Sequence, residues 1–298
     1  MLFIIIKLNL LSLFSLFSLY MITIKFNDDI NQIYNSFEEI LQLAYYNDIV
    51  QINCYDNKLS SLPELPNSLQ GLNCNYNNLS CLPELPNSLK YLYCADNNLS
   101  CLPELPNSLI DLYCNNNNLS NLPELPNSLI NLYCSCNNVS SLPELPNSLI
   151  ELNCNNNNFS NLPELPNSLV ELFCAYNIIS SLPELPNSLK YLHCAGNNLS
   201  SLPELPNSLI HLWCQYNCLS SLPELPNSLN HIEYSNNPIY KYIKNYFDGK
   251  TINYFEYHNN IKIIFSNKIG NWYLDCKYNP KYLYCRKRLM KEYEELYG

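Results

Sequence analysis

The sequence predicts an α/β-type solenoid, a right-handed superhelix with a parallel β-sheet on its concave face, a Pro-rich non-helical convex side and small caps at both ends. Three observations predict it. The octapeptide Leu-Pro-Glu-Leu-Pro-Asn-Ser-Leu recurs nine times at a strict 20-residue spacing, from Leu62 to Leu222. Each copy leads into an alternation such as Leu72-Asn73-Cys74, which is the period of a short strand. Two prolines in every copy exclude a helix from the return path.

The repeat divides the 298 residues into four predicted segments. Residues 1–26 are an apolar leader, and residues 27–48 are expected to form an N-terminal capping helix. Residues 49–238 are the solenoid of about ten coils, and residues 239–298 are a Tyr- and Lys-rich C-terminal cap. Caps are expected because the terminal coils of a solenoid would otherwise expose apolar surface.

The expected N-terminal capping helix starts at the polar, acidic stretch of residues 27–29, which suits a helix N-terminus. Apolar residues follow at helical spacing, namely Ile30, Ile33, Phe37, Ile40, Leu41 and Ala44. The C-terminal cap holds 11 of the 16 basic residues of the chain. A closing helix is expected there over residues 282–296.

Three interpretations of the leader stay open. Residues 8–24 carry no charge over 17 residues, a length at the short end for a membrane-spanning helix. The same stretch has the apolar centre of a signal peptide but lacks its small-residue cleavage site. The third interpretation is an overcalled start, with Met21 as the true initiator. A membrane contact is therefore expected only through residues 1–24.

Every coil is predicted to bury the same positions, because no repeat has a complete core alone. These are Leu62, Leu65, Leu69, Leu72, Cys74, Leu79 and their equivalents. An Asn at the turn is expected to be structural, since buried backbone groups need partners and an amide both donates and accepts. This Asn ladder comprises Asn57, Asn77, Asn97, Asn117, Asn137, Asn157, Asn177, Asn197, Asn217 and Asn237.

The chain has 15 cysteines, and nine of them fill one inward slot, where Cys behaves as a small apolar residue. This Cys ladder comprises Cys54, Cys74, Cys94, Cys114, Cys134, Cys154, Cys174, Cys194 and Cys214. Such a column would be hazardous in an oxidising compartment, which favours a reducing one. Cys276 and Cys285 have no second pair to complete a zinc site, and zinc is not expected.

The units resemble the leucine-rich repeat, L-x-x-L-x-L-x-x-N-x-L, with Cys in the third Leu position. Their Leu-Pro-x-Leu-Pro half is similar to the short type in secreted effectors of enteric bacteria. The near-identical copies and the Asn-, Ile- and Tyr-rich flanks also resemble repeat proteins of large DNA viruses. Such effectors often carry a C-terminal ubiquitin-ligase domain with a nucleophilic Cys. Neither Cys276 nor Cys285 stands in a Cys-x-Asp motif, so the resemblance implies no ligase activity here.

The composition excludes several classes of function. The chain has 16 basic against 26 acidic residues, and its net charge of −10 argues against nucleic-acid binding, which needs Lys and Arg. With 5 Gly it has no phosphate-binding glycine loop, and no cofactor is expected. His211 and His231 share an outward slot in adjacent coils, but that surface is open and no metal site is expected.

The candidate binding residues lie on the outward positions of the predicted sheet, which differ from coil to coil while the frame does not. One outward column is rich in aromatic side chains, and exposed aromatics on a rigid scaffold are typical interface anchors. We name as the aromatic column Tyr93, Tyr113, Tyr133, Phe173, His193 and Trp213.

These observations predict a non-enzymatic, cytoplasmic scaffold that binds a protein, one of a host cell, on its concave face. Two alternatives stay open. One is a membrane-anchored or surface protein with a structural or adhesive role. The other is a subunit that recruits substrates to a separate ubiquitin ligase.

Overall fold

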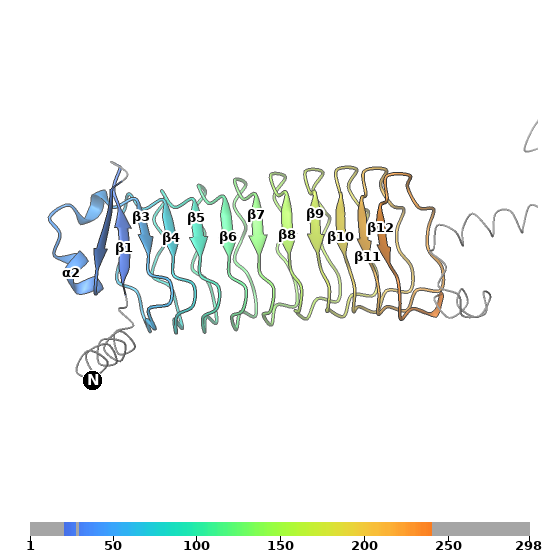
Figure 1. The fold of residues 1–298 in the computed structure, drawn as a ribbon, viewed down its shortest axis with the longest axis horizontal. Coiled ribbons are helices and arrows are strands. Elements are labelled where there is room, and N and C mark those ends of the chain that lie inside the picture. The colour runs from blue at the N-terminus through green and yellow to red at the C-terminus, as the bar shows by residue number, and fades with distance from the viewer. Residues whose placement is uncertain (1–20, 28–29, 240–298) are drawn as a thin grey trace, which may run out of the picture. The chain divides into compact units, whose positions relative to one another are not determined.

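A computed structural model of the protein describes residues 21–27 and 30–239, which form a row of stacked coils (Figure 1). All strands in these residues belong to one twelve-stranded sheet, in the order β12-β11-β10-β9-β8-β7-β6-β5-β4-β3-β1-β2. The described residues lie almost entirely in the first of two compact units, which ends at Pro238.

Most of the leader, residues 1–20, lies outside the described residues, as does the C-terminal cap with its expected closing helix from residue 240 onward. Within residues 21–27 and 30–239, no helix is long and apolar enough to span a bilayer.

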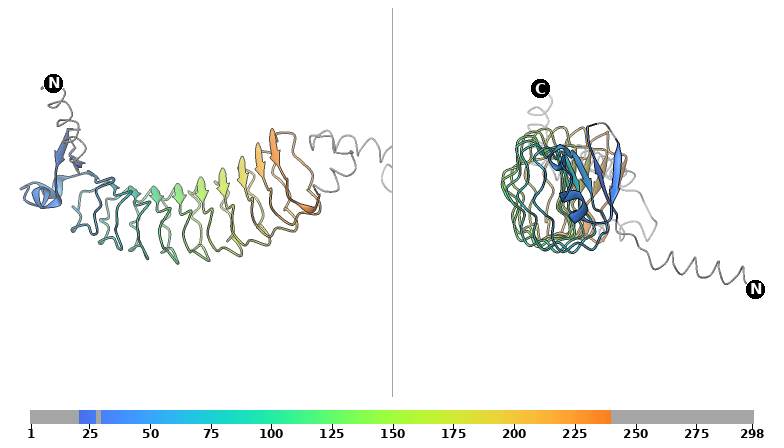
Figure 2. Two further views of the ribbon diagram at one scale, coloured as in Figure 1. Left: turned by 60° about the horizontal axis from the view of Figure 1, so that its bottom comes forward. Right: turned by 90° about the vertical axis from the view of Figure 1, so that its left-hand side faces the viewer.

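Ten strands are the predicted repeat strands, one to a coil and three residues each. Neighbouring strands are parallel and in register, so that Leu72 pairs with Leu92 and Leu92 with Leu112. Figure 2 shows these strands on the inner side of the curved row. They are β3 (Gln51–Asn53), β4 (Gly71–Asn73), β5 (Tyr91–Tyr93), β6 (Asp111–Tyr113), β7 (Asn131–Tyr133), β8 (Glu151–Asn153), β9 (Glu171–Phe173), β10 (Tyr191–His193), β11 (His211–Trp213) and β12 (His231–Glu233). The predicted solenoid is confirmed.

The core is a stack of identical layers. The positions of Leu69, Leu72, Cys74 and Leu79 are fully buried in every coil from Leu69 to Leu219. The predicted burial of the Leu62 and Leu65 positions holds only in some coils, because both lie on the convex side, where neighbouring coils cover them incompletely. The core that each coil shares with its neighbours is therefore built mainly from the strand and the residues that flank it.

The Pro-rich half of each coil returns through a tight turn. The Leu69 N–H donates to the Pro66 carbonyl at 3.0 Å, and the equivalent bond recurs in each later coil up to Leu229. Proline suits this path because its fixed φ favours an extended chain and its missing N–H leaves no donor to satisfy.

The Ser of the octapeptide links each coil to the one before it. The Ser88 hydroxyl donates to the Leu69 carbonyl at 2.6 Å, and Ser228 donates to the Leu209 carbonyl at 2.7 Å. The equivalent bond is present in every coil between them. The sequence signal for this second ladder is a polar residue at one fixed position of every octapeptide, although no role for it was among the predictions.

The Asn ladder lies at the opposite edge of each strand. The Asn137 side-chain nitrogen donates to the Cys114 carbonyl of the preceding coil at 3.0 Å and to the Cys134 carbonyl of its own coil at 3.1 Å. Its side-chain oxygen accepts the Leu119 N–H at 3.0 Å. Each amide therefore supplies a donor and an acceptor to backbone groups that the stacked coils remove from water.

These amides also hold a strained turn. The residue before each ladder Asn has a positive φ, between 52° and 57° in all the non-glycine cases, including the bulky Tyr76, Tyr176 and Tyr216. Left-handed backbone disfavours residues with a Cβ. The turn persists because the hydrogen bonds on both sides of it fix the backbone in place.

The N-terminal cap differs from the single helix expected over residues 27–48. A hairpin of β1 (Ile22–Lys25) and β2 (Asn31–Tyr34) comes first. A short helix α2 (Phe37–Leu41) and a 3-10 turn η1 (Tyr46–Asp48) follow. Strand β1 pairs antiparallel with β3 and extends the sheet beyond the first coil.

Burial with a period of two explains this difference. Ile22 and Ile24 are 1% and 0% exposed, although the sequence assigned them to the leader. Of the predicted helical stripe, Phe37 and Ile40 are buried, whereas Ile33 is 61% exposed. A strand can satisfy the open backbone groups along the edge of β3, which a helix cannot do. The folded cap thus begins before the boundary expected after residue 26.

The Cys ladder runs through the centre of the core. All nine of its thiols are 0% exposed, and each of the 13 described cysteines is a free thiol. Burial raises the pKa of Cys134 and of Cys174 to about 12, against a smaller lowering by backbone hydrogen bonds. The ladder thiols therefore stay protonated and behave as apolar side chains at neutral pH.

We expect Asn137→Ala to lower the free energy of unfolding by about 1–3 kcal/mol, because the backbone partners of a buried amide lose their hydrogen bonds. The control is Asn138→Ala, which removes the next amide along the chain, an exposed one. Urea unfolding of both variants measures the difference. Equal midpoints for the two would contradict a structural role for the ladder.

The ladder thiols should resist maleimide at pH 7.5 until the protein is denatured, whereas the exposed Cys81 and Cys136 react at once.

Because folding raises the pKa of the ladder thiols above that of an unfolded Cys, about 8.5, the folded state binds more protons above that pH. The free energy of unfolding should accordingly fall as the pH rises from about 8.5 toward 12. Urea unfolding at several pH values measures this dependence. Mass spectrometry measures the maleimide labelling, and labelling of the ladder thiols before denaturation would contradict their protection.

Candidate functional site

The candidate site is the outward face of the parallel sheet. In a three-residue strand the middle side chain points into the core and the two flanking side chains point outward. In β5 to β11 the middle residue is buried and both flanking residues are partly exposed. The face is therefore two columns wide, and strand register fixes the neighbours of each side chain.

The structure brings the predicted aromatic column together in two groups. The rings of Tyr93 and Tyr113 lie 4.9 Å apart, and those of Tyr113 and Tyr133 lie 4.4 Å apart. Asn153 then interrupts the column. A second group follows, in which His193 lies 6.4 Å from Phe173 and 5.7 Å from Trp213.

Acidic side chains of the other column hold the tyrosines of the first group. The Tyr133 hydroxyl donates to Glu151, and the Tyr93 hydroxyl donates to Asp111 at 3.3 Å. Asp111 also accepts a hydrogen bond from Asn131 at 2.7 Å. Burial, together with the charge of Asp111, raises the pKa of Tyr93 to about 12. These hydroxyls remain protonated donors, and their rings keep a fixed orientation.

The second group extends into the other column, whose residues were not among the predicted binding residues. Tyr191 stacks on His211 with ring centres 5.3 Å apart and an interplanar angle of 30°. His211 in turn stacks on Trp213 at 5.2 Å, and His231 lies 5.8 Å from His211. The signal was available in the sequence, since residues 20 apart are neighbours and residues two apart share a face.

The histidines of this group pack among aromatic rings. Burial lowers the pKa of His193, which leaves its ring uncharged at neutral pH. His211 Nδ1 is buried and has no hydrogen-bond partner among the described residues. In the part of the chain that the structure describes, no three His, Cys, Asp or Glu side chains are placed to hold a metal ion.

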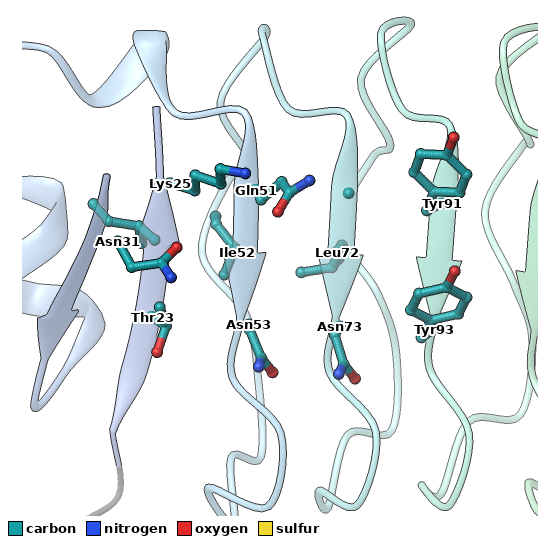
Figure 3. Close-up of a pocket in the computed structure, with 12 residues that line it drawn as sticks. Thr23, Lys25, Asn31, Gln51, Ile52, Asn53, Leu72, Asn73, Tyr91 and Tyr93 are labelled. Carbon is teal, nitrogen blue, oxygen red and sulfur yellow. The ribbon is translucent and has the colours of Figure 1, made fainter. Parts of the chain in front are cut away.

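A pocket of about 410 Å³ opens at the N-terminal end of the face (Figure 3). It forms where Gly71 leaves a gap in the outward column between Gln51 and Tyr91. Asn53 and Asn73 project side by side at one end of it in Figure 3. Four amide side chains and two tyrosine rings make up half of the residues that line the pocket. Its volume is within the range of ligand sites, about 300–1,000 Å³.

No family model matches the chain, and no curated protein matches it by sequence. Solved structures do match. YopM from Yersinia enterocolitica WA-314 is 42% identical, with a TM-score of 0.56, over 63% of this chain and 47% of YopM. YopM from Yersinia pestis, a leucine-rich effector protein, is also 42% identical, with a TM-score of 0.60, over 62% of this chain and 54% of YopM. A Shigella effector LRR domain is 35% identical over 60% of this chain and 76% of that one, with a TM-score of 0.49.

The chain belongs to the leucine-rich-repeat proteins. This leucine-rich-repeat protein spans about half the length of the YopM chains that it matches. The predicted resemblance to the repeats of bacterial effectors is confirmed, and the resemblance to viral repeat proteins stays a prediction.

In this leucine-rich-repeat solenoid, Gly71→Ala should keep or raise the free energy of unfolding, by about 0.4–1 kcal/mol. A Cβ there would lie 3.6 Å from the nearest Gln51 atom and 4.0 Å from the nearest Tyr91 atom, which is ordinary contact. The matched variant is Gly196→Ala, which should destabilise, because φ is +63° and a Cβ would lie 2.6 Å from the Tyr176 ring. Thermal unfolding compares the two, and a large loss at Gly71 would show that the pocket needs its glycine for folding.

Proposed function

We propose that the protein is a non-enzymatic scaffold that binds another protein, one of a host cell, on the concave face of its solenoid. The observation that carries the proposal is the stacked group of Tyr93, Tyr113 and Tyr133. It places three partly exposed aromatic rings on adjacent strands of the sheet, with the centres of neighbouring rings 4.4–4.9 Å apart.

The aromatic column has the chemistry of an interface. Tyrosine and tryptophan supply large apolar area at a small loss of side-chain entropy, and they are enriched among the residues that dominate binding. Since Tyr93 and Tyr133 are already held by carboxylates, binding would order little more of them. A preformed face loses less free energy to ordering than a flexible one does.

The relatives support the proposal at the level of the repeat. The Yersinia pestis relative is a leucine-rich effector protein, and effectors act on components of the cell that receives them. We assign this chain a partner of the same general kind, a host protein. The acidic composition, with a net charge of −10, supports a protein partner over a nucleic acid.

The thiols support a reducing compartment, and we propose the cytoplasm. Cys81 and Cys101 are exposed at equivalent positions of adjacent coils, and Cys136 and Cys218 are exposed as well. Free, exposed thiols beside a buried ladder are compatible with a cytosol that keeps cysteines reduced.

Tyr113→Ala, Tyr133→Ala and Trp213→Ala should each weaken partner binding by about 30-fold, the loss of about 2 kcal/mol that is typical of an anchor residue. A partner is first isolated from host lysate on the immobilised protein, and its dissociation constant is then measured with each variant. Circular dichroism confirms that the variants are folded.

The control for this series is Glu144→Ala, an exposed residue of the convex side that recurs in every octapeptide. It should bind like the wild type. Tyr133→Phe distinguishes the contribution of the ring to binding from that of the hydroxyl, because this variant keeps the ring but loses the hydrogen bond to Glu151. If all three aromatic variants bind like the wild type, the concave face is not the binding surface.

A further inference from the structure

The C-terminal half of the concave face combines a carboxylate with a cluster of rings. Register places Glu171 beside Tyr191, and Phe173 beside His193. Outward residues two apart on a strand share the face, so these four side chains surround one spot on β9 and β10. We call them the β9–β10 patch.

Glu171 differs from the other carboxylates of the sheet. Asp111 accepts hydrogen bonds from Tyr93 and Asn131, and Glu151 accepts one from Tyr133. Glu233 accepts the Ser235 N–H at 2.9 Å. No described residue donates a hydrogen bond to Glu171, although it is partly buried.

The surroundings of Glu171 also disfavour its charge. Burial, and next the neighbouring Glu151, raises the pKa of Glu171. No Lys or Arg stands on an outward position of β3 to β12. Lys190, which precedes Tyr191, is exposed and makes no ion pair with Glu171. The patch therefore presents a partly desolvated negative charge, with no Lys or Arg on the outward positions of the repeat strands.

The rings of the patch are partly exposed. Phe173 and His193 meet edge to face, with ring centres 6.4 Å apart and an interplanar angle of 89°. Tyr191 is supported from the far side by stacking on His211. His193 is uncharged at neutral pH because burial lowers its pKa, so it does not repel a cation.

We infer that the β9–β10 patch binds an arginine side chain of the partner, whose guanidinium pairs with the Glu171 carboxylate and lies against the rings of Tyr191 and Phe173. This inference rests on the proposed function, since it names the chemistry of the partner at one place on the same face. A guanidinium fits because it is planar, pairs with a carboxylate through two N–H groups and stacks on aromatic rings.

Other side chains fit the patch less well. An apolar side chain would complete the burial of Glu171 without compensating its charge, which is unfavourable. An acidic side chain would be repelled by Glu171 and Glu151. A lysine supplies the charge but is a compact, strongly hydrated ammonium that does not stack flat on rings.

The test is a titration of the full-length protein with the peptide acetyl-Gly-Arg-Gly-amide, followed by NMR of the Trp213 indole N–H, which the variant Trp213→Phe assigns. Trp213 lies 5.7 Å from His193, at the border of the patch. We expect a saturable shift with the arginine peptide. The citrulline peptide, which has the same shape without the charge, and the lysine peptide should both bind at least about fivefold more weakly.

Glu171→Gln should weaken the arginine peptide by at least about fivefold and leave the citrulline peptide unchanged. The matched control is Glu144→Gln, which removes the same charge from the convex side and should change neither. Equal binding of the arginine and citrulline peptides, equal effects of the two Gln variants, or no saturable shift would each overturn the inference. The proposed function is judged separately by the aromatic variants and the isolated partner, so that a failure of the inference is distinguishable from a failure of the proposed function.

Discussion

Every coil of this solenoid must satisfy backbone groups that its neighbours remove from water, and the rest of the structure depends on this constraint. The Asn ladder meets it at one edge of the strands, and the Ser ladder meets it near the other. Both ladders bond the preceding coil, and the Asn ladder also bonds the turn of its own coil. A coil removed from its neighbours would therefore lose both its core and the partners of its polar groups, and the coils are stable only as a stack.

The same constraint shapes the N-terminal end. The first ladder residue, Asn57, has no earlier repeat to bond, and its side-chain nitrogen donates to the Met21 carbonyl at 3.3 Å instead. Strand β1 then pairs with β3 as a further strand of the sheet. The cap thus takes the place of a preceding coil at the N-terminal end of the repeats. It supplies a backbone carbonyl, a strand and two buried isoleucines.

The sequence was sufficient for the parts of the fold that repeat. Strand positions, register and the inward slots follow from a fixed 20-residue period, and the structure agrees with them from Gln51 to Glu233. The cap does not repeat. Its buried apolar residues follow two different spacings over a short segment, since Ile22 and Ile24 stand two apart and Phe37 and Ile40 stand three apart. Pairing with the open edge of β3 decided between the two, and that edge belongs to another part of the chain.

The sequence predicted which residues form the columns of the candidate face, but it did not predict the contacts between their side chains. The six aromatic positions follow from the alternation along each strand. The bonds from Tyr93 to Asp111 and from Tyr133 to Glu151 join the third residue of one strand to the first residue of the next, a separation of 18. Such diagonal pairs could be found by writing neighbouring coils side by side. The geometry of a side chain decides whether a bond forms, and at Glu171 none does.

This difference between carboxylates divides the face by its chemistry. Side chains of the sheet donate hydrogen bonds to the carboxylates of Asp111 and Glu151. These carboxylates therefore orient tyrosine rings and are less available to pair with a group of a partner. At Glu171 the strand holds a carboxylate close to apolar rings, where desolvation is partly complete and compensation is missing. The backbone frame is the same at all three places, because the ladders fix it without regard to the outward side chains. The same rigid frame therefore places a group of hydrogen-bonded tyrosines and a carboxylate to which no described residue donates a hydrogen bond only a few strands apart.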